Sequence, residues 1–235
     1  MMVAIGNFLF HYRNVLFPLF YVALFVPSPR VIDSYRAAAL AGFTVCLAGQ
    51  VVRVVTIGLV YIIRGGSKRR IYAKDLVTTG IFAHTRNPLY IGNILIILGL
   101  GIIADSVLFL AVFVPLFLFA YQAIVLAEED FLRGKFGRQY EAYMRDVNRW
   151  FPNPGGLGDT FGSMRFRWKR VIIREYNATY IWLVGALFVF MKNLAAADRA
   201  LFSRTLPLAA GVFAILTASY LIIRHLKKSK KLRDE

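Results

Sequence analysis

The sequence predicts an all-α, polytopic membrane protein with about six transmembrane helices, or five if the first, short run does not cross. Hydrophobic residues make up 58% of the 235 residues, and the mean hydropathy of +0.56 is too high for a soluble domain of this size. The apolar runs are continuous, whereas the strands of a membrane barrel alternate in polarity. Helices are therefore expected to cross the bilayer, which takes roughly 20 apolar residues each.

The first run contains Pro18 and is the shortest, so it is the weakest candidate for a full crossing. Nothing near the N-terminus resembles a cleaved signal peptide, and we expect this helix to be retained. The third span should begin at Pro88, because a proline in the first helical turn lacks only an N–H that has no partner there. The expected spans lie at about 14–27, 37–63, 88–104, 106–127, 178–197 and 205–223.

The stretch 153–158, with three glycines and a proline, should break the helical structure. Behind it, residues 165–174 mix cationic and aromatic side chains, which is typical of an interfacial helix. We expect two units. Residues 1–152 form a four-span core with a polar cap, and residues 163–235 form an interfacial helix, a transmembrane hairpin and a basic tail.

The distribution of basic residues predicts how the protein is oriented across the membrane. Of the 29 Lys and Arg, 23 fall on one side of the six expected spans and five on the other, while Arg53 lies inside the second span. The positive-inside rule places the basic side, with both termini, in the cytosol. We expect a multi-pass protein of a bacterial inner membrane. The net charge is +16, and the basic residues that produce it lie next to the spans, where they attract anionic lipid headgroups. No nucleic acid is therefore expected as a partner.

Metal and disulfide sites are not expected. Cys46 is the single cysteine, and the three histidines, His11, His84 and His225, are scattered along the chain.

Two polar signatures bracket the third and fourth apolar runs. Residues 86–92 (RNPLYIG) come just before the third run, and residues 128–143 (EEDFLRGKFGRQYEAY) follow the fourth. If these runs form a helical hairpin, the signatures meet at one membrane face. The sequence thus predicts a cytosolic pocket at the lipid boundary, suited to one water-soluble and one lipidic reactant.

Arg86 precedes the expected helix start at Pro88. The N-terminal end of a helix favours an anionic group, and a guanidinium grips a carboxylate with two hydrogen bonds. The alternative for Arg86 is a boundary cation that binds lipid phosphate.

Glu128 and Glu129 stand where the fourth helix leaves the bilayer, and acidic residues at this depth are costly unless they have partners. Neighbours on a helix point about 100° apart, so only one of the two is expected to line a pocket. The alternative is a solvated helix end in which one glutamate pairs with Arg133.

Phe136, Tyr140 and Tyr143 recur at helical spacing and should share one face of a cytosolic helix, as a ligand wall or as packing. Arg53 is the other intramembrane polar site. It could face an acidic headgroup, pair with a core carboxylate, or extend towards the interface.

The chain contains four motifs, given at the end of this paragraph, that resemble those of the isoprenylcysteine carboxyl methyltransferase and phospholipid methyltransferase family of integral membrane enzymes. The resemblance is strongest from about 64 to 152 and does not reach the C-terminal hairpin. The motifs are Gly80-Ile81-Phe82-x-x-x-Arg86-Asn87-Pro88-x-Tyr90-x-Gly92, Glu128-Glu129-x-x-Leu132, Phe136-Gly137-x-x-Tyr140-x-x-Tyr143 and Val147-x-Arg149-x-x-Pro152.

The resemblance implies methyl transfer from S-adenosylmethionine to a lipid-embedded acceptor, either isoprenoid-like or phospholipid-like. It also implies a cofactor site formed by Arg86, Asn87, Pro88, Tyr90, Glu128 or Glu129, Tyr140 and Tyr143. The candidate catalytic residues are Glu129, Glu128 and Arg53, with Glu129 slightly preferred. A carboxylate acceptor needs no base, whereas an amine acceptor must lose a proton, for which either glutamate is the candidate.

The chain departs from the family at two places. Asn87 stands where the family usually has histidine, so this position has no titratable group. Gln122, Ala123 and Ile124 occupy the stretch where eukaryotic isoprenylcysteine enzymes carry an arginine for the substrate carboxylate.

Two other functions remain as alternatives. A non-catalytic membrane interaction protein is suggested by the C-terminal hairpin, whose small residues Ala210, Ala214 and Ala218 allow close helix packing, within the chain or in a homo-oligomer. A lipid-phase reductase of the sterol reductase type would need a nicotinamide site, which the sequence does not reveal.

Overall fold

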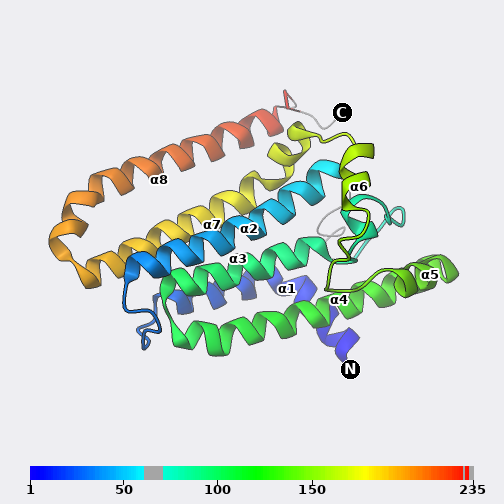
Figure 1. The fold of residues 1–235 in the computed structure, drawn as a ribbon, viewed down its shortest axis with the longest axis horizontal. Helices are drawn as coiled ribbons and strands as arrows, with labels where there is room; N and C mark the ends of the chain where they lie inside the picture. Colours follow the sequence, from blue (N-terminus) through cyan, green and yellow to red (C-terminus); the bar gives the residue numbers. More distant parts are fainter. Residues whose placement is uncertain (61–70, 230, 233–235) are drawn as a thin grey trace.

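The computed structural model describes residues 1–60, 71–229 and 231–232. These ranges are helical, and they contain no strand, so the all-α prediction is confirmed. Figure 1 shows a long bundle with α8 along one edge and α4 along the other. The long helices are α1 (Met2–Val22), α2 (Tyr35–Leu59), α3 (Pro88–Ala104), α4 (Val114–Phe136), α7 (Trp168–Ala197) and α8 (Arg199–Lys228). Shorter elements are η1 (Ala23–Phe25), η2 (Gly80–Ala83), the π-helical turn η3 (Phe109–Phe113), α5 (Arg138–Asp146) and α6 (Leu157–Ser163).

Five helical segments in the described ranges are long and apolar enough to cross a membrane, and the apolar α3 has 17 residues. At 1.5 Å per residue α3 is about 26 Å long, close to the thickness of the hydrocarbon core. The protein is thus an integral membrane protein, and the expected all-α polytopic class is confirmed. The first run, expected to be the weakest candidate for a crossing, lies in a full-length segment, Met2–Phe25 (24 residues), and the short helix is α3.

Several helix boundaries differ from the expected spans, and at two of them the contacts give the reason. The first helix begins at Met2 instead of about residue 14, because Gly6 packs directly against the backbone of Ala123 in α4 and extends the apolar contact. The second helix ends at Leu59, where Val60 turns to an extended conformation. There the carbonyl of Gly58 accepts a hydrogen bond from the backbone N–H of Arg167 (2.9 Å).

The stretch 165–174 does not form a separate interfacial helix. From Trp168 onward it is the beginning of α7, because no glycine or proline interrupts the chain before Gly185. α7 packs against both α2 and α3, whereas α8 packs against α7 and buries none of its residues. The C-terminal hairpin therefore supplies one helix to the core.

Phe136 does not share a helix with Tyr140 and Tyr143, contrary to the expected stripe. Gly137 has a φ of +52°, a value that favours glycine, and the chain turns there between α4 and α5. The sequence pattern missed this break because glycine is also tolerated within helices.

The beginning of α1, the end of α8, α5 and α6 lie at one end of the bundle, on the right of Figure 1, which we call the terminal end. Several basic residues that carried the predicted orientation lie outside the described residues: Arg64, Lys68, Arg69, Arg70, Lys230 and Arg233. The cytosolic orientation of the terminal end stays a prediction.

The most extensive helix contact joins α2 to α3, and it depends on glycine. A Cβ atom on Gly99 would lie 2.5 Å from both the carbonyl oxygen of Gly42 and the sulfur of Cys46. Small residues bring membrane helices this close, and the backbones then gain dispersion contacts.

We expect Gly99→Ala to lower the free energy of unfolding by about 1–3 kcal/mol, because the added methyl group overpacks a backbone contact that cannot yield. Thermal unfolding in detergent would measure this loss. Gly211→Ala in α8 is the matched control, since a Cβ there meets nothing within 4 Å. Equal unfolding midpoints for the two variants would contradict the proposed close contact.

Candidate functional site

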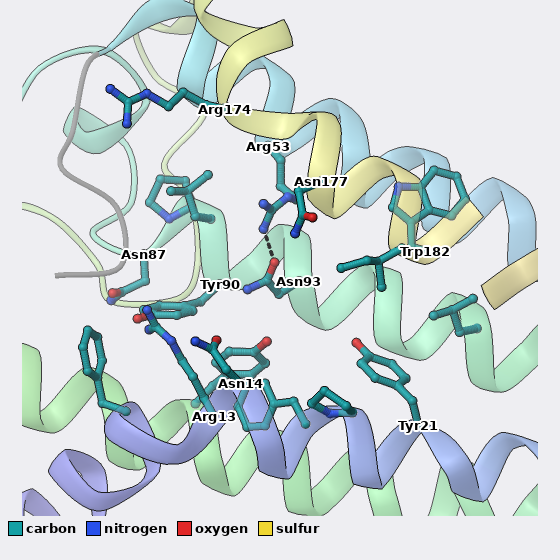
Figure 2. Close-up of a pocket in the computed structure, with 18 of the residues that line it drawn as sticks. Arg13, Asn14, Tyr21, Arg53, Asn87, Tyr90, Asn93, Arg174, Asn177 and Trp182 are labelled. Carbon is teal, nitrogen blue, oxygen red and sulfur yellow. Dashed lines mark hydrogen bonds between the residues drawn. The ribbon is translucent and has the colours of Figure 1, made fainter. Parts of the chain in front are cut away.

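A cavity of about 1190 Å³ runs from the terminal end into the bundle between α1 and α7. Figure 2 shows its side chains between these two helices, with α2, α3 and α4 behind them. At its far end the ammonium of Lys192 in α7 donates to the backbone oxygen of Leu24 in η1 (2.7 Å). The volume exceeds the roughly 300–1,000 Å³ that is usual for one small ligand.

Arg86 lines this cavity and is nearly buried, with 9% of its side chain exposed. One terminal nitrogen lies 3.2 Å from the Oε1 atom of Glu129, and the other donates to the backbone oxygen of Met144 (3.4 Å). The Nε atom is buried and has no hydrogen-bond partner. Arg86 is thus a wall residue of the cavity, and one of its buried donors has no acceptor in the protein.

Glu128 and Glu129 face different surroundings, as the helix geometry predicts. Glu128 is half-buried on the cavity wall, where its Oε1 atom accepts a hydrogen bond from the hydroxyl of Tyr90 (2.7 Å). Glu129 is 5% exposed and forms a two-bonded ion pair with Arg149 (2.9 and 2.7 Å). The alternative pairing with Arg133 does not occur, since that side chain approaches the sulfur of Met144 (3.7 Å).

Arg149 joins the two signatures. Its hydrogen bond with Glu129 raises the pKa of the guanidinium. Its backbone oxygen accepts bonds from Asn87 Nδ2 (3.2 Å) and Thr85 Oγ1 (3.3 Å). Arg149 was visible in a family motif, but its spacing alone assigned it no partner.

Asn87 and Pro88 also line the cavity. Asn87 occupies the position before the first turn of α3, and Pro88 is the first helical residue, so the predicted start of the third span is confirmed. No side chain caps this first turn. The positive end of the helix dipole therefore faces the same region as Arg86.

Tyr140 and Tyr143 are buried, and neither is among the residues that line the cavity. The hydroxyl of Tyr143 donates to the backbone oxygen of Phe82 (2.6 Å), and the Phe82 side chain is part of the cavity wall. Burial raises the pKa of both tyrosines, so they remain neutral phenols at physiological pH. They support the wall from behind, and direct contact with a cofactor stays a prediction.

Arg53 lies deeper on the cavity wall and pairs with a carboxylate. Its Nε and Nη2 atoms donate to the two carboxylate oxygens of Glu175 in α7 (2.8 and 2.9 Å), and both side chains are 3% exposed. Nη1 also donates to Asn93. Of the three expectations for Arg53, pairing with a core carboxylate is the one that the structure shows.

Several residues of the cavity wall, and Glu175 behind it as the partner of Arg53, were missed by the sequence reasoning. Asn93 was detectable as a polar residue inside an apolar run, but Glu175 lies 122 positions from Arg53 and no spacing connects them. Other polar residues of the cavity wall that were missed include Arg13, Asn14, Tyr21, Tyr121 and Asn177.

Residues 38–139 match the family model of phospholipid methyltransferases. The predicted family resemblance is confirmed over this segment. The segment contains Arg53, both glutamates and the Arg86 loop, whereas Glu175 lies outside it.

Two curated relatives are similar to this chain. The nickel-cobalt-cadmium resistance protein NccN of Alcaligenes xylosoxydans xylosoxydans is 28% identical over 174 residues, which cover 74% of this chain and 69% of NccN. The cobalt-zinc-cadmium resistance protein CzcN of Cupriavidus metallidurans is 38% identical over 77 residues, which cover 33% of this chain and 35% of CzcN. No solved structure matches.

Both relatives are named as metal resistance proteins, so possible metal ligands in this chain are of interest. Within residues 1–60, 71–229 and 231–232, no group of three or more His, Cys, Asp or Glu side chains is arranged to hold a metal ion.

Proposed function

We propose that the protein transfers a methyl group from S-adenosylmethionine to a lipidic acceptor. The observation that carries the proposal is that both polar signatures meet on one cavity, and that this cavity continues between α1 and α7 into the apolar bundle. A water-soluble donor and a lipid-soluble acceptor can therefore reach one site from opposite directions.

The residues at the terminal end suit the amino acid part of the donor. The unpartnered Nε of Arg86 and the uncapped first turn of α3 favour a carboxylate. Asn87, Pro88 and Tyr90 form the adjoining wall. When bound, S-adenosylmethionine supplies an electrophilic methyl group next to a positively charged sulfur.

Glu128 is the acid–base candidate, because it is the glutamate on the cavity wall. Its carboxylate would take the proton that the acceptor loses as the new bond to the methyl carbon forms and the carbon–sulfur bond breaks. Tyr90 orients this carboxylate through its hydroxyl. Glu129, bound to two arginines, would maintain the donor side of the pocket.

We also propose that the terminal end faces the cytosol of a bacterial cell. Support comes from the basic residues that lie at this end in the described ranges, among them Arg133, Lys135, Arg138 and Arg145.

A second candidate is a non-catalytic membrane interaction protein. α8 favours it, because none of its 30 residues is buried and its apolar surface is open to lipid or to a partner. The relatives, named as metal resistance proteins, are compatible with either function.

We expect the purified protein in detergent to bind S-adenosylmethionine and its demethylated product with dissociation constants of roughly 1 μM to 1 mM, the usual range for enzyme substrates. Isothermal titration calorimetry measures both. Methionine and adenosine, each alone, are the controls and should bind more weakly, because each fills half of the site. Absence of heat for both whole molecules, with folded protein, would favour the interaction protein.

A further inference from the structure

A ring of polar side chains surrounds the cavity at an intermediate depth. We call it the polar belt: Arg53 of α2, Asn93 of α3, Tyr121 of α4 and Asn177 of α7. Figure 2 shows Arg53, Asn93 and Asn177 around the same space. Arg53 donates to Asn93, which also hydrogen-bonds with Tyr121. Four helices thus place hydrogen-bonding groups at one level.

The surroundings of the belt differ on its two sides. Towards the terminal end lie charged residues, among them Arg13, Arg86 and Glu128, and Arg174 and Lys227 also line the cavity. On the other side the wall is mostly apolar, with Leu24, Leu100, Val184, Gly185 and Phe188, and its polar groups include the hydroxyl of Tyr21 and the indole of Trp182 (Figure 2). Leu100 lies seven residues beyond Asn93 in α3, which corresponds to about 10 Å. This stretch beyond the belt would hold the first part of a long apolar chain.

The belt carries hydrogen-bonding capacity without net charge. Glu175 neutralises Arg53 in a buried pair in which two hydrogen bonds are made. Together with the bond to Asn93, these occupy three of the five N–H donors that a guanidinium offers. A neutral acceptor atom could take a remaining donor. An anionic group at the same place would be repelled by the carboxylate of Glu175 and would lose its hydration, so its binding there is disfavoured.

We propose that the polar belt binds the uncharged, hydrogen-bonding head group of a long-chain amphiphile, with a hydroxyl as its simplest form. The inference rests on the proposed function, in which this amphiphile is the methyl acceptor. Glu175, from the helix outside the family segment, is a positioning residue. It cancels the charge of Arg53 and thereby excludes anionic head groups from the belt.

The test compares two probes with the same chain, hexadecanol and hexadecane sulfonate. Both compete with radiolabelled hexadecanol for purified protein in a neutral detergent. The readout is the affinity for the sulfonate divided by the affinity for the alcohol. Glu175→Gln should raise this ratio about tenfold or more, because Arg53 then offers an unbalanced positive charge at low dielectric.

Two further variants control for other causes. Glu141→Gln makes the same chemical change on the exposed surface of α5 and should leave the ratio unchanged. The double variant Arg53→Met/Glu175→Gln removes both charges and should return the ratio to that of the wild type. The ratio is measured on the folded population, so a lower yield of folded protein does not change it.

Three results would each overturn the inference. The ratio could stay unchanged in Glu175→Gln, it could rise equally in Glu141→Gln, or the wild type could show no saturable binding of hexadecanol. Donor binding is measured separately by calorimetry. If the donor fails to bind and the ratio shifts as expected, the belt assignment stands while the methyltransferase proposal fails. If the donor binds and the ratio does not shift, the methyltransferase proposal stands while the belt assignment fails.

Discussion

Glu128→Gln is expected to reduce methyl transfer by roughly 10²–10⁴-fold at saturating donor, the usual range for loss of a general base. An uncharged hydroxyl or amine must lose a proton on methylation, and Glu128 is the carboxylate that lines the cavity. The amide keeps an oxygen for the hydroxyl of Tyr90, so the protein should remain folded. Raising the pH should restore part of the rate, because the acceptor then ionises without help.

Glu129→Gln should act differently, although it removes a neighbouring carboxylate. Glu129 pairs with Arg86 and Arg149, and neither Glu129 nor its partners offers a free base to the cavity. We expect a loss of stability on the order of 1–3 kcal/mol, since Arg149 is 32% exposed and partly screened, together with weaker donor binding.

Labelled methyl transfer and thermal unfolding, measured on both variants with Glu141→Gln as the control, separate the two roles. Equal and small effects on transfer would remove the acidic pair from the mechanism. A large loss of transfer in Glu129→Gln with full activity in Glu128→Gln would reverse the assignment.

Arg86→Ala is expected to weaken the binding of S-adenosylmethionine roughly 10–150-fold, which corresponds to the 1.5–3 kcal/mol of a charge-assisted hydrogen bond. The buried Nε of Arg86 has no hydrogen-bond partner in the protein, and in the proposed complex it would donate to the carboxylate of the methyl donor. The helical fold should persist, because Arg149 still holds Glu129.

Calorimetry of Arg86→Ala against Arg138→Ala tests this expectation. Arg138 begins α5 and is exposed, so its loss removes a similar charge from the same end of the bundle. Unchanged affinity in Arg86→Ala, with circular dichroism like that of the wild type, would make Arg86 a structural partner of Glu129 only.

The membrane class, the helix count and the start of α3 could be predicted from the sequence because they depend on local properties. Continuous apolar runs determine spans through the cost of leaving backbone groups unpaired in lipid. Pro88 marks a helix start through its own ring and missing N–H. The difference between Glu128 and Glu129 also followed from the local helical rotation, although its direction did not.

Helix ends that depend on neighbours were predicted less well. Gly137 ends α4 because the chain turns towards α5, and Gly6 extends α1 because it meets the backbone of Ala123. The packing of Gly6 is not visible in a window of local sequence, since its partner lies elsewhere in the chain. At Gly137 the local pattern does not distinguish a glycine within a helix from one that ends it.

The polar contacts of the site were decided by the tertiary structure. The family motifs predicted that Arg86 and the two glutamates lie at the same end of the bundle. Helix packing decides that Glu128 faces the cavity and that Glu129 pairs with Arg149. Arg53 finds Glu175 across 122 residues because α7 packs on α2. The sequence by itself determined that a charged residue, Arg53, lies within an apolar span, and a buried charge needs a partner. Which residue becomes that partner depends on how the helices pack, which only the tertiary structure decided.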